Sequence, residues 1–220
     1  MQTIASRVGD ALAAGGGTVL SGATRVVAAA RASAKPLHPK GKVVLAQLRR
    51  HGASPPTGVA WLDEPGLDEV LVRRSRAVGF PGRLPDVHGM ALRVPLAEGG
   101  HGDVLFAMTG LGPVGRFVLT ASRSPSGRPM TTLLPYATPA GPLELAAIPR
   151  AENRFELACA SRRGHWRPFA DLVLSSVEEP DSLVSFDPLR NTLPGLDNYG
   201  WVRRLREPAY VVARRSRRPD

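Results

Sequence analysis

Cysteine is nearly absent from this chain of 220 residues, because Cys159 is its one thiol. A framework of internal disulfides is therefore excluded. Cys159 lies in an apolar-polar alternation at residues 155–159, so we interpret it as a small buried strand residue without a catalytic role. The sequence also lacks a run of roughly 18 apolar residues that would span a bilayer, and its N-terminus lacks the pattern of a secretory signal. These absences predict a cytoplasmic protein with no membrane partner.

Periodicity is missing as well, since the 23 glycines and 21 prolines are spread along the chain without a repeat. This excludes a collagen-like protein and argues against a helical bundle. Aromatic residues make up 5% of the chain, and no stacking motif interleaves the basic residues, which argues against nucleic-acid binding. The hydrophobic content of 43% is enough for one well-buried domain with short elements and many turns.

Positive charge is abundant but unevenly placed. The formal charge is +10, and the segment from Arg203 to Asp220 carries seven arginines against the acidic Glu207 and Asp220. Such a cluster suits nucleic acid, an anionic membrane, or the carboxylates of a bound cofactor. Composition alone favours nucleic acid or simple solvation of the charges.

The pattern of apolar residues divides the chain at residue 34. Residues 1–34 predict a helical or flexible N-terminal segment, and residues 35–220 predict one α+β domain with an antiparallel β-barrel core, flanking helices and a C-terminal helix. Residues 162–165 suit a hairpin turn, and residues 199–217 predict the closing helix, which Pro208 should kink or begin. The expected strands are residues 43–48, 59–62, 70–74, 90–94, 104–108, 117–120, 143–148, 155–160 and 169–177.

Arg206 and Tyr210 are four residues apart and therefore share one face of the closing helix. A fixed cation beside a phenol favours the phenolate and lowers its pKa, and a phenolate is a ligand for ferric iron. Arg203 and Arg217 fall on roughly the same face and suit the propionates of a haem. Taken alone, the pair is more typical of a surface or packing contact than of an iron site.

Three motifs in a common order support an iron-binding role for this pair. Residues 186–188 read Phe-Asp-Pro, residues 194–196 read Pro-Gly-Leu, and the Arg206 to Tyr210 spacing comes next. This order resembles the proximal side of catalases, which reads Phe-Asp/Ser-Pro, Pro-Gly-Ile and Arg-x-x-x-Tyr. The resemblance implies haem b as cofactor, Tyr210 as its iron ligand and Arg206 as the cation beside that ligand.

Two further segments resemble the distal side of the same family. Residues 37–41 are similar to the catalase segment Val-His-Ala-Lys-Gly, which makes His38 the group that moves a proton between the two peroxide oxygens. Residues 72–75 and 85–93 resemble the family pattern Arg-Phe-Ser followed by Asp-Val-Arg-Gly-Phe-Ala-Val-Lys. By this resemblance Arg73 contacts a haem propionate and Ser75 orients His38.

The chain also departs from the family. Lys35 replaces a propionate-binding arginine and keeps the charge without the bidentate fork. The asparagine that holds peroxide in catalases is missing, because residues 106–108 read Phe-Ala-Met. An organic hydroperoxide therefore becomes a plausible substrate beside hydrogen peroxide. The chain is shorter than a catalase and lacks the parts that build the family's tetramer, so we expect a monomer or homodimer.

Two other sets of residues are not interpreted as sites. The acidic pairs at residues 63–64 and 178–179 stand beside prolines and are typical of solvated turns. A group of histidines with Asp103 lacks the spacing of a metal site. Its members are His88, His101 and His165.

The sequence thus predicts a haem-dependent peroxidase or catalase-type oxidoreductase. A binding protein that keeps the fold, lacks haem and holds a lipid or other apolar ligand is the alternative, and a basic nucleic-acid-binding protein is the second. The expected catalytic residues are His38 and Ser75, and the expected haem-binding residues are Lys35, Arg73, Arg206, Tyr210 and Arg217.

Overall fold

The computed structural model describes residues 41–77, 84–161, 163–177, 179–180 and 184–215, with the backbone alone for 179–180 and 212–215. The barrel strands and the closing helix lie within these ranges. The expected N-terminal segment, His38, Lys35 and Arg217 lie outside the described residues.

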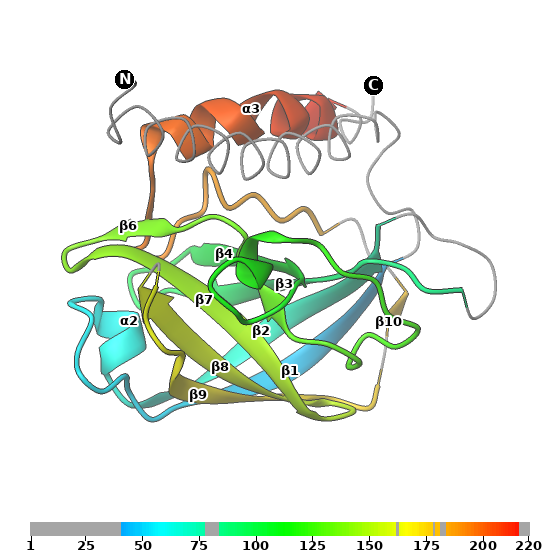
Figure 1. The fold of residues 1–220 in the computed structure, drawn as a ribbon, viewed down its shortest axis with the longest axis horizontal. Coiled ribbons are helices and arrows are strands. Elements are labelled where there is room, and N and C mark those ends of the chain that lie inside the picture. The colour runs from blue at the N-terminus through cyan, green and yellow to red at the C-terminus, as the bar shows by residue number, and fades with distance from the viewer. Residues whose placement is uncertain (1–40, 78–83, 162, 178, 181–183, 216–220) are drawn as a thin grey trace, which may run out of the picture.

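A closed antiparallel barrel of eight strands forms the body of the molecule (Figure 1). Its ring order is β7-β5-β4-β3-β2-β1-β9-β8, and pairing of β7 with β8 closes it. The expected α+β barrel fold is confirmed. The barrel strands are β1 (Lys42–Arg50), β2 (Gly66–Arg76), β3 (His88–Pro95), β4 (His101–Met108), β5 (Met130–Thr131), β7 (Gly141–Ala151), β8 (Arg154–Ser161) and β9 (Arg167–Leu174).

Short elements extend this ring. Strand β6 (Tyr136–Thr138) pairs with β7, β11 (Asp197–Asn198) pairs with β6, and β10 (Glu179–Pro180) pairs with β1. The helices are α2 (Ala60–Asp63), a 3₁₀ turn (Gly115–Phe117) and α3 (Gly200–Arg215). Within the described part, no helix is long and apolar enough to cross a membrane.

Side chains alternate between the inside and the outside of the barrel along each strand, so the inward ones fill the core. Closure of the ring removes unpaired strand edges from the barrel. In β1, Val44, Ala46 and Leu48 are buried while Leu45 and Gln47 point outward. The largest fully buried side chains, Phe155 and Phe169 among them, come from the whole ring. Cys159 is also fully buried, and burial raises the pKa of its thiol, so its interpretation as a packed strand residue is confirmed.

Two of the expected strands are wrong. Residues 59–62 enter the short helix α2. Residues 117–120 begin in the 3₁₀ turn, and beyond it Leu119 makes an isolated bridge to Thr109. Asp63 is the reason for the first difference, since its carboxylate accepts hydrogen bonds from the Thr57 amide at 2.8 Å, the Thr57 hydroxyl at 2.9 Å and the Gly58 amide at 2.8 Å. Burial raises the pKa of Asp63, but these hydrogen bonds outweigh burial and lower it. Asp63 therefore holds a turn together and is not merely a solvated loop residue.

Helix α3 confirms the expected closing helix, with Pro208 in its interior. It lies along one side of the barrel and is reached by a long connection (Figure 1). Leu193 and Leu196 in that connection are buried in the core, and a Cβ on Gly102 would come 2.6 Å from Leu193 Cδ2. This close approach requires glycine at position 102 and fixes where the connection crosses β4.

Candidate functional site

The outer face of β2, β3 and β4 carries several small residues. Arg73 and Ser75 are two residues apart in β2. They lie outside the barrel, because side chains alternate along a strand and the neighbouring Val72 is buried in the core. Ser75 pairs with Gly89, and Gly89 pairs with Ala107. A Cβ added to Gly89 would come 3.1 Å from Ser75 Oγ, so glycine at this position leaves room beside the Ser75 hydroxyl.

The next row on the same face consists of Arg73, Ala91 and Leu105. Arg73 is buried, and its guanidinium lies against Gly41, where an added Cβ would come 2.6 Å from Arg73 Nη2. The two rows together give a mostly apolar surface with one buried cation and one hydroxyl.

Ala107 occupies this outer face, whereas Met108 is fully buried inside the barrel. The outward position in the segment that lacks the family's asparagine therefore carries only a methyl group. Hydrogen bonding to a peroxide cannot come from this side chain.

Arg206 and Tyr210 lie four residues apart on α3, on the face that also carries the buried Val202. Arg206 Nη2 donates a hydrogen bond to the carbonyl oxygen of Thr132 at 3.2 Å. Thr132 is buried and directly follows β5. Arg206 thus ties the helix to the barrel instead of serving the phenol alone.

Tyr210 is partly buried, and burial raises its pKa to about 12. The Arg206 cation lowers this pKa as expected, but burial outweighs it, and Asp187 and Tyr136 raise it further. The expected lowering by Arg206 is therefore present, but it does not bring the pKa of Tyr210 below its ordinary value. Among the described residues, none hydrogen-bonds the Tyr210 hydroxyl.

The connection that leads to α3 is anchored by the buried carboxylate of Asp103. Arg93 donates to it through Nε at 2.9 Å and Nη2 at 3.1 Å. The Asp187 amide and Asn191 Nδ2 donate to Asp103 Oδ2 at 2.8 and 2.9 Å. The Arg93 guanidinium also stacks 4.7 Å from the centroid of the Phe186 ring. The Phe-Asp-Pro motif therefore has a structural task, which the sequence analysis did not assign to it.

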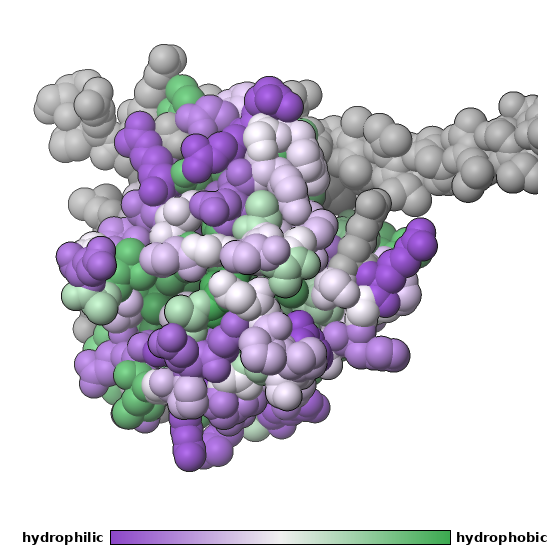
Figure 2. All heavy atoms as spheres, turned by 90° about the vertical axis from the view of Figure 1, so that its left-hand side faces the viewer, coloured by the Kyte–Doolittle hydropathy of each residue, from purple (hydrophilic) through white to green (hydrophobic). Residues whose placement is uncertain are grey.

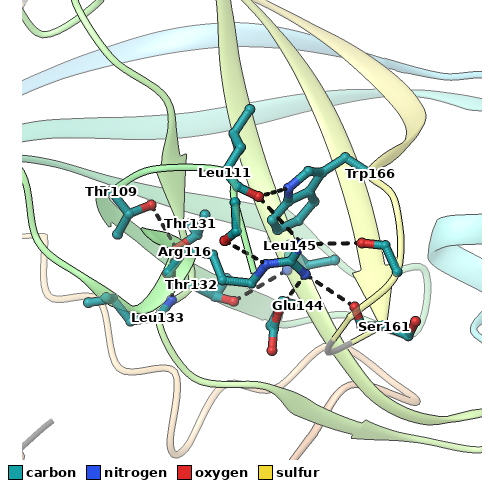
Figure 3. A network of polar contacts seen from close by, with 12 residues as sticks. Thr109, Leu111, Arg116, Thr131, Thr132, Leu133, Glu144, Leu145, Ser161 and Trp166 are labelled. Atoms are coloured by element: carbon teal, nitrogen blue, oxygen red, sulfur yellow. Dashed lines mark hydrogen bonds and ion pairs between the residues drawn. The ribbon is translucent and has the colours of Figure 1, made fainter. Parts of the chain in front are cut away.

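A second anchor is the polar network around Arg116, which also includes Thr131 and Thr132 (Figure 3). Arg116 Nη1 donates to Glu144 Oε2 at 3.0 Å and to the Ser161 carbonyl at 3.1 Å, and both side chains of the ion pair are buried. The Trp166 ring covers the guanidinium at 4.6 Å. Thr131 Oγ1 donates to the Arg116 carbonyl at 2.7 Å, which fixes the end of β5.

This second anchor was missed by sequence reasoning. Glu144 stands inside an apolar run, 28 residues from Arg116. The one sequence signal that could have indicated a buried ion pair was a charged residue within an apolar run.

The structure separates the histidines that were set aside as a metal group. His88 is buried, and its Nε2 lies 3.1 Å from the Ser122 carbonyl oxygen, with its pKa lowered by burial and by Arg76. His101 lies 3.9 Å from Asp103. No three metal-binding side chains come together anywhere in the described ranges.

Two solved structures with a similar fold are catalases. A fungal catalase matches with 12% identity and a TM-score of 0.55, covering 76% of this chain and 56% of that chain. Catalase A from Saccharomyces cerevisiae matches with 10% identity and a TM-score of 0.59, covering 82% of this chain and 60% of that one. No family model and no curated protein matches the sequence.

The architecture is therefore that of a barrel with a closing helix packed on its outside. In particular, the chain has a catalase-like fold, and the resemblance seen in the sequence is confirmed at the level of the fold. The chain spans about 56 to 60% of the length of the catalases that it matches.

Proposed function

We propose that the protein binds haem b between α3 and the outer face of β2 to β4, and that it acts on hydrogen peroxide or an organic hydroperoxide. The observation that carries this proposal is the Arg206 and Tyr210 pair on the helix of a catalase-like fold. The two rows on the outer face of the barrel, in which Gly89, Ala91 and Ala107 are small, support it.

The residues present fit a haem in their chemistry. A phenol oxygen that no described residue engages is a ligand for ferric iron once its proton leaves. The pKa of about 12 makes that proton costly to remove, and Arg206 reduces the cost. The buried Arg73 guanidinium suits a propionate, and Ala91, Leu105 and Ala107 suit the flat apolar part of the ring.

Bound haem would supply a redox-active iron for cleavage of the peroxide O–O bond. The protein's own residues have the remaining tasks. Tyr210 would hold the iron, and Arg73, with Lys35 and Arg217, would pair with the propionates. His38 would take a proton from one peroxide oxygen and return it to the other, and Ser75 would orient the His38 ring.

A binding protein without haem is the second candidate function. Two features favour it, namely the burial that raises the pKa of Tyr210 and so disfavours the phenolate, and the methyl group of Ala107 in place of an amide. A protonated phenol donates a hydrogen bond, so Tyr210 would orient the polar end of a lipid whose chain lies on the apolar rows.

Titration with hemin tests the proposal, with the absorption spectrum as the readout. We expect a ferric high-spin spectrum for the wild type, its loss in Tyr210→Phe, and its retention in the matched variant Tyr199→Phe. His38→Ala should bind hemin but lose peroxide turnover. A wild type that stays colourless after growth with a haem precursor and takes up no hemin contradicts the proposal and leaves the binding protein.

A further inference from the structure

The Thr132 carbonyl is freed from the barrel ladder by an exchange of hydrogen-bond acceptors. Continuing the register of β5 and β7 places Thr132 opposite Leu145. In a hydrogen-bonded antiparallel pair, each residue donates its N–H to the carbonyl of the other. The Thr132 amide does donate to the Leu145 carbonyl at 3.0 Å, but the Leu145 amide donates to the Thr132 hydroxyl at 3.3 Å. The hydroxyl therefore replaces the carbonyl of its own residue in the ladder (Figure 3).

A sharp turn directly after Thr132 holds the freed carbonyl in place. The Leu134 amide donates to this carbonyl at 2.7 Å, which closes a three-residue turn around Leu133. Among the described residues other than glycine, Leu133 alone has a positive φ, at 61°. This left-handed backbone costs free energy in a residue with a Cβ, and such strain persists only where the surrounding contacts impose it.

The same turn forms a bulge between β5 and β6. Thr131 pairs with Ala146 and Tyr136 pairs with Leu143, so residues 132–135 on one side face only residues 144–145 on the other. Bulges are over-represented beside active sites, where they redirect the chain.

The Thr131 hydroxyl fixes the start of the turn. It donates to the Arg116 carbonyl at 2.7 Å. It accepts hydrogen bonds from the Thr109 hydroxyl at 3.0 Å and from the Leu133 amide at 3.3 Å. One donor and two acceptor positions are the whole capacity of a hydroxyl group. Since Thr131 and Thr109 are fully buried, water does not compete for these bonds, and the core of the barrel imposes the strained turn.

The freed carbonyl meets an arginine of α3. Hydrophilic side chains gather over the end of the molecule that carries this helix (Figure 2). Arg206 belongs to the helix but is partly buried, and its Nη2 donates to the Thr132 carbonyl at 3.2 Å. An arginine side chain has many rotamers, so a fixed acceptor decides where its charge lies.

We propose that Thr132 is the positioning residue for Arg206. Its hydroxyl takes over the ladder bond, and its carbonyl is thereby free to hold the guanidinium beside Tyr210. The effect on haem binding rests on the proposed function, whereas the contact between Thr132 and Arg206 does not depend on it. The experiment therefore has one part without hemin and one part with it.

A double-mutant cycle in urea unfolding of the full chain without hemin tests the contact. Thr132→Val keeps the shape of the side chain but removes the hydroxyl, so the Leu145 amide must take back the carbonyl or lose its acceptor. We expect Thr132→Val and Arg206→Gln to be coupled by about fivefold or more in the unfolding equilibrium constant, because both remove the same contact. Additive effects of these two substitutions overturn the inference.

Thr138→Val is the matched control for this cycle. It also removes a hydroxyl hydrogen bond, from Thr138 Oγ1 to the Gly141 carbonyl at 2.7 Å, in the turn between β6 and β7. Its effect should add to that of Arg206→Gln. Equal coupling of Thr138 and Thr132 to Arg206 overturns the inference, because any lost hydroxyl would then have the same effect.

Hemin titration of the same variants tests the positioning role. Thr132→Val should weaken hemin binding by about threefold or more in the wild-type background and leave it unchanged in the Arg206→Gln background. Thr132→Ser keeps a hydroxyl and should bind hemin like the wild type. Leu133→Gly should do the same, because glycine adopts a positive φ without strain. If Thr132→Val does not fold, Leu133→Val replaces it in both parts, since a β-branched residue resists the positive φ and displaces the same carbonyl.

The two parts separate failure of the inference from failure of the proposed function. Wild-type hemin affinity in Thr132→Val overturns the positioning role, and so does an equal loss in the wild-type and Arg206→Gln backgrounds. A wild type that takes up no hemin contradicts the proposed function, and the unfolding cycle then decides alone whether Thr132 holds Arg206.

Discussion

Arg206 Nη2 donates a hydrogen bond to the Thr132 carbonyl oxygen at 3.2 Å, and the same guanidinium lowers the pKa of Tyr210 four residues further along α3. One side chain thus fixes the helix to the barrel and adjusts the acidity of the proposed iron ligand. These two tasks are separable by substitution, because lysine keeps the charge but not the planar fork.

Hemin affinity should depend on pH through Tyr210. Since the phenol has a pKa of about 12 in the protein, iron binding releases its proton, and affinity should rise up to about tenfold per pH unit below that value. Arg206→Gln should weaken hemin binding at every pH, and Arg206→Lys should weaken it less. Spectroscopic hemin titrations between about pH 6 and pH 8 measure both effects. An affinity that is flat with pH in the wild type contradicts Tyr210 ligation.

Stability should fall at alkaline pH for the same reason. The ordinary pKa of tyrosine is 10.0, and that of Tyr210 in the folded chain is about 12. The unfolded chain therefore loses its proton first, so the contribution of the neutral phenol is complete below pH 10 and is lost as pH rises toward 12. Tyr210→Phe should remove about 1 to 3 kcal/mol of this pH dependence in urea unfolding at the two ends of that range.

Removal of the Asp103 carboxylate should destabilise the fold strongly. Asp103→Ala leaves the Arg93 guanidinium without its carboxylate and frees the Asp187 amide, so we expect a loss of about 3 kcal/mol in the free energy of unfolding. Glu156→Ala is the control, because its partner Arg150 is 58% exposed and such pairs contribute below about 1 kcal/mol. Similar losses in the two variants in urea unfolding would disprove the anchoring role.

An amide at position 107 should favour hydrogen peroxide as substrate. Ala107→Asn places a hydrogen-bonding group on the outer face, so we expect faster peroxide turnover per hemin bound. Met108→Asn buries the amide inside the barrel and should instead cost about 2 kcal/mol or more of stability. Steady-state peroxide assays and thermal unfolding separate the two outcomes. If Ala107→Asn changes neither peroxide turnover nor hemin uptake, that face does not border the haem.

The strands could be predicted from sequence wherever alternation ran long enough. Residues 43–48 and 90–94 carry period-two burial and appear as parts of β1 and β3. Residues 59–62 are apolar but too short to distinguish helix from strand, and the carboxylate of Asp63 decides the outcome.

The site was harder to predict, because its properties depend on contacts distant in sequence. The spacing of Arg206 and Tyr210 revealed the pair, but the burial that raises the Tyr210 pKa comes from the rest of the fold. Asp103 and Asp187 are 84 residues apart, so no local pattern indicates their hydrogen bond.

Closure of the barrel also has a consequence for synthesis on the ribosome. Strand β1 pairs with β2, which comes soon after it in the chain, and with β9, which emerges much later, so that Ala46 faces Leu174. Until β9 is made, one edge of β1 has exposed amides and carbonyls that another nascent chain could bind. Molecular chaperones that shield this edge during translation should therefore raise the yield of folded protein, and truncation before β9 should give aggregates.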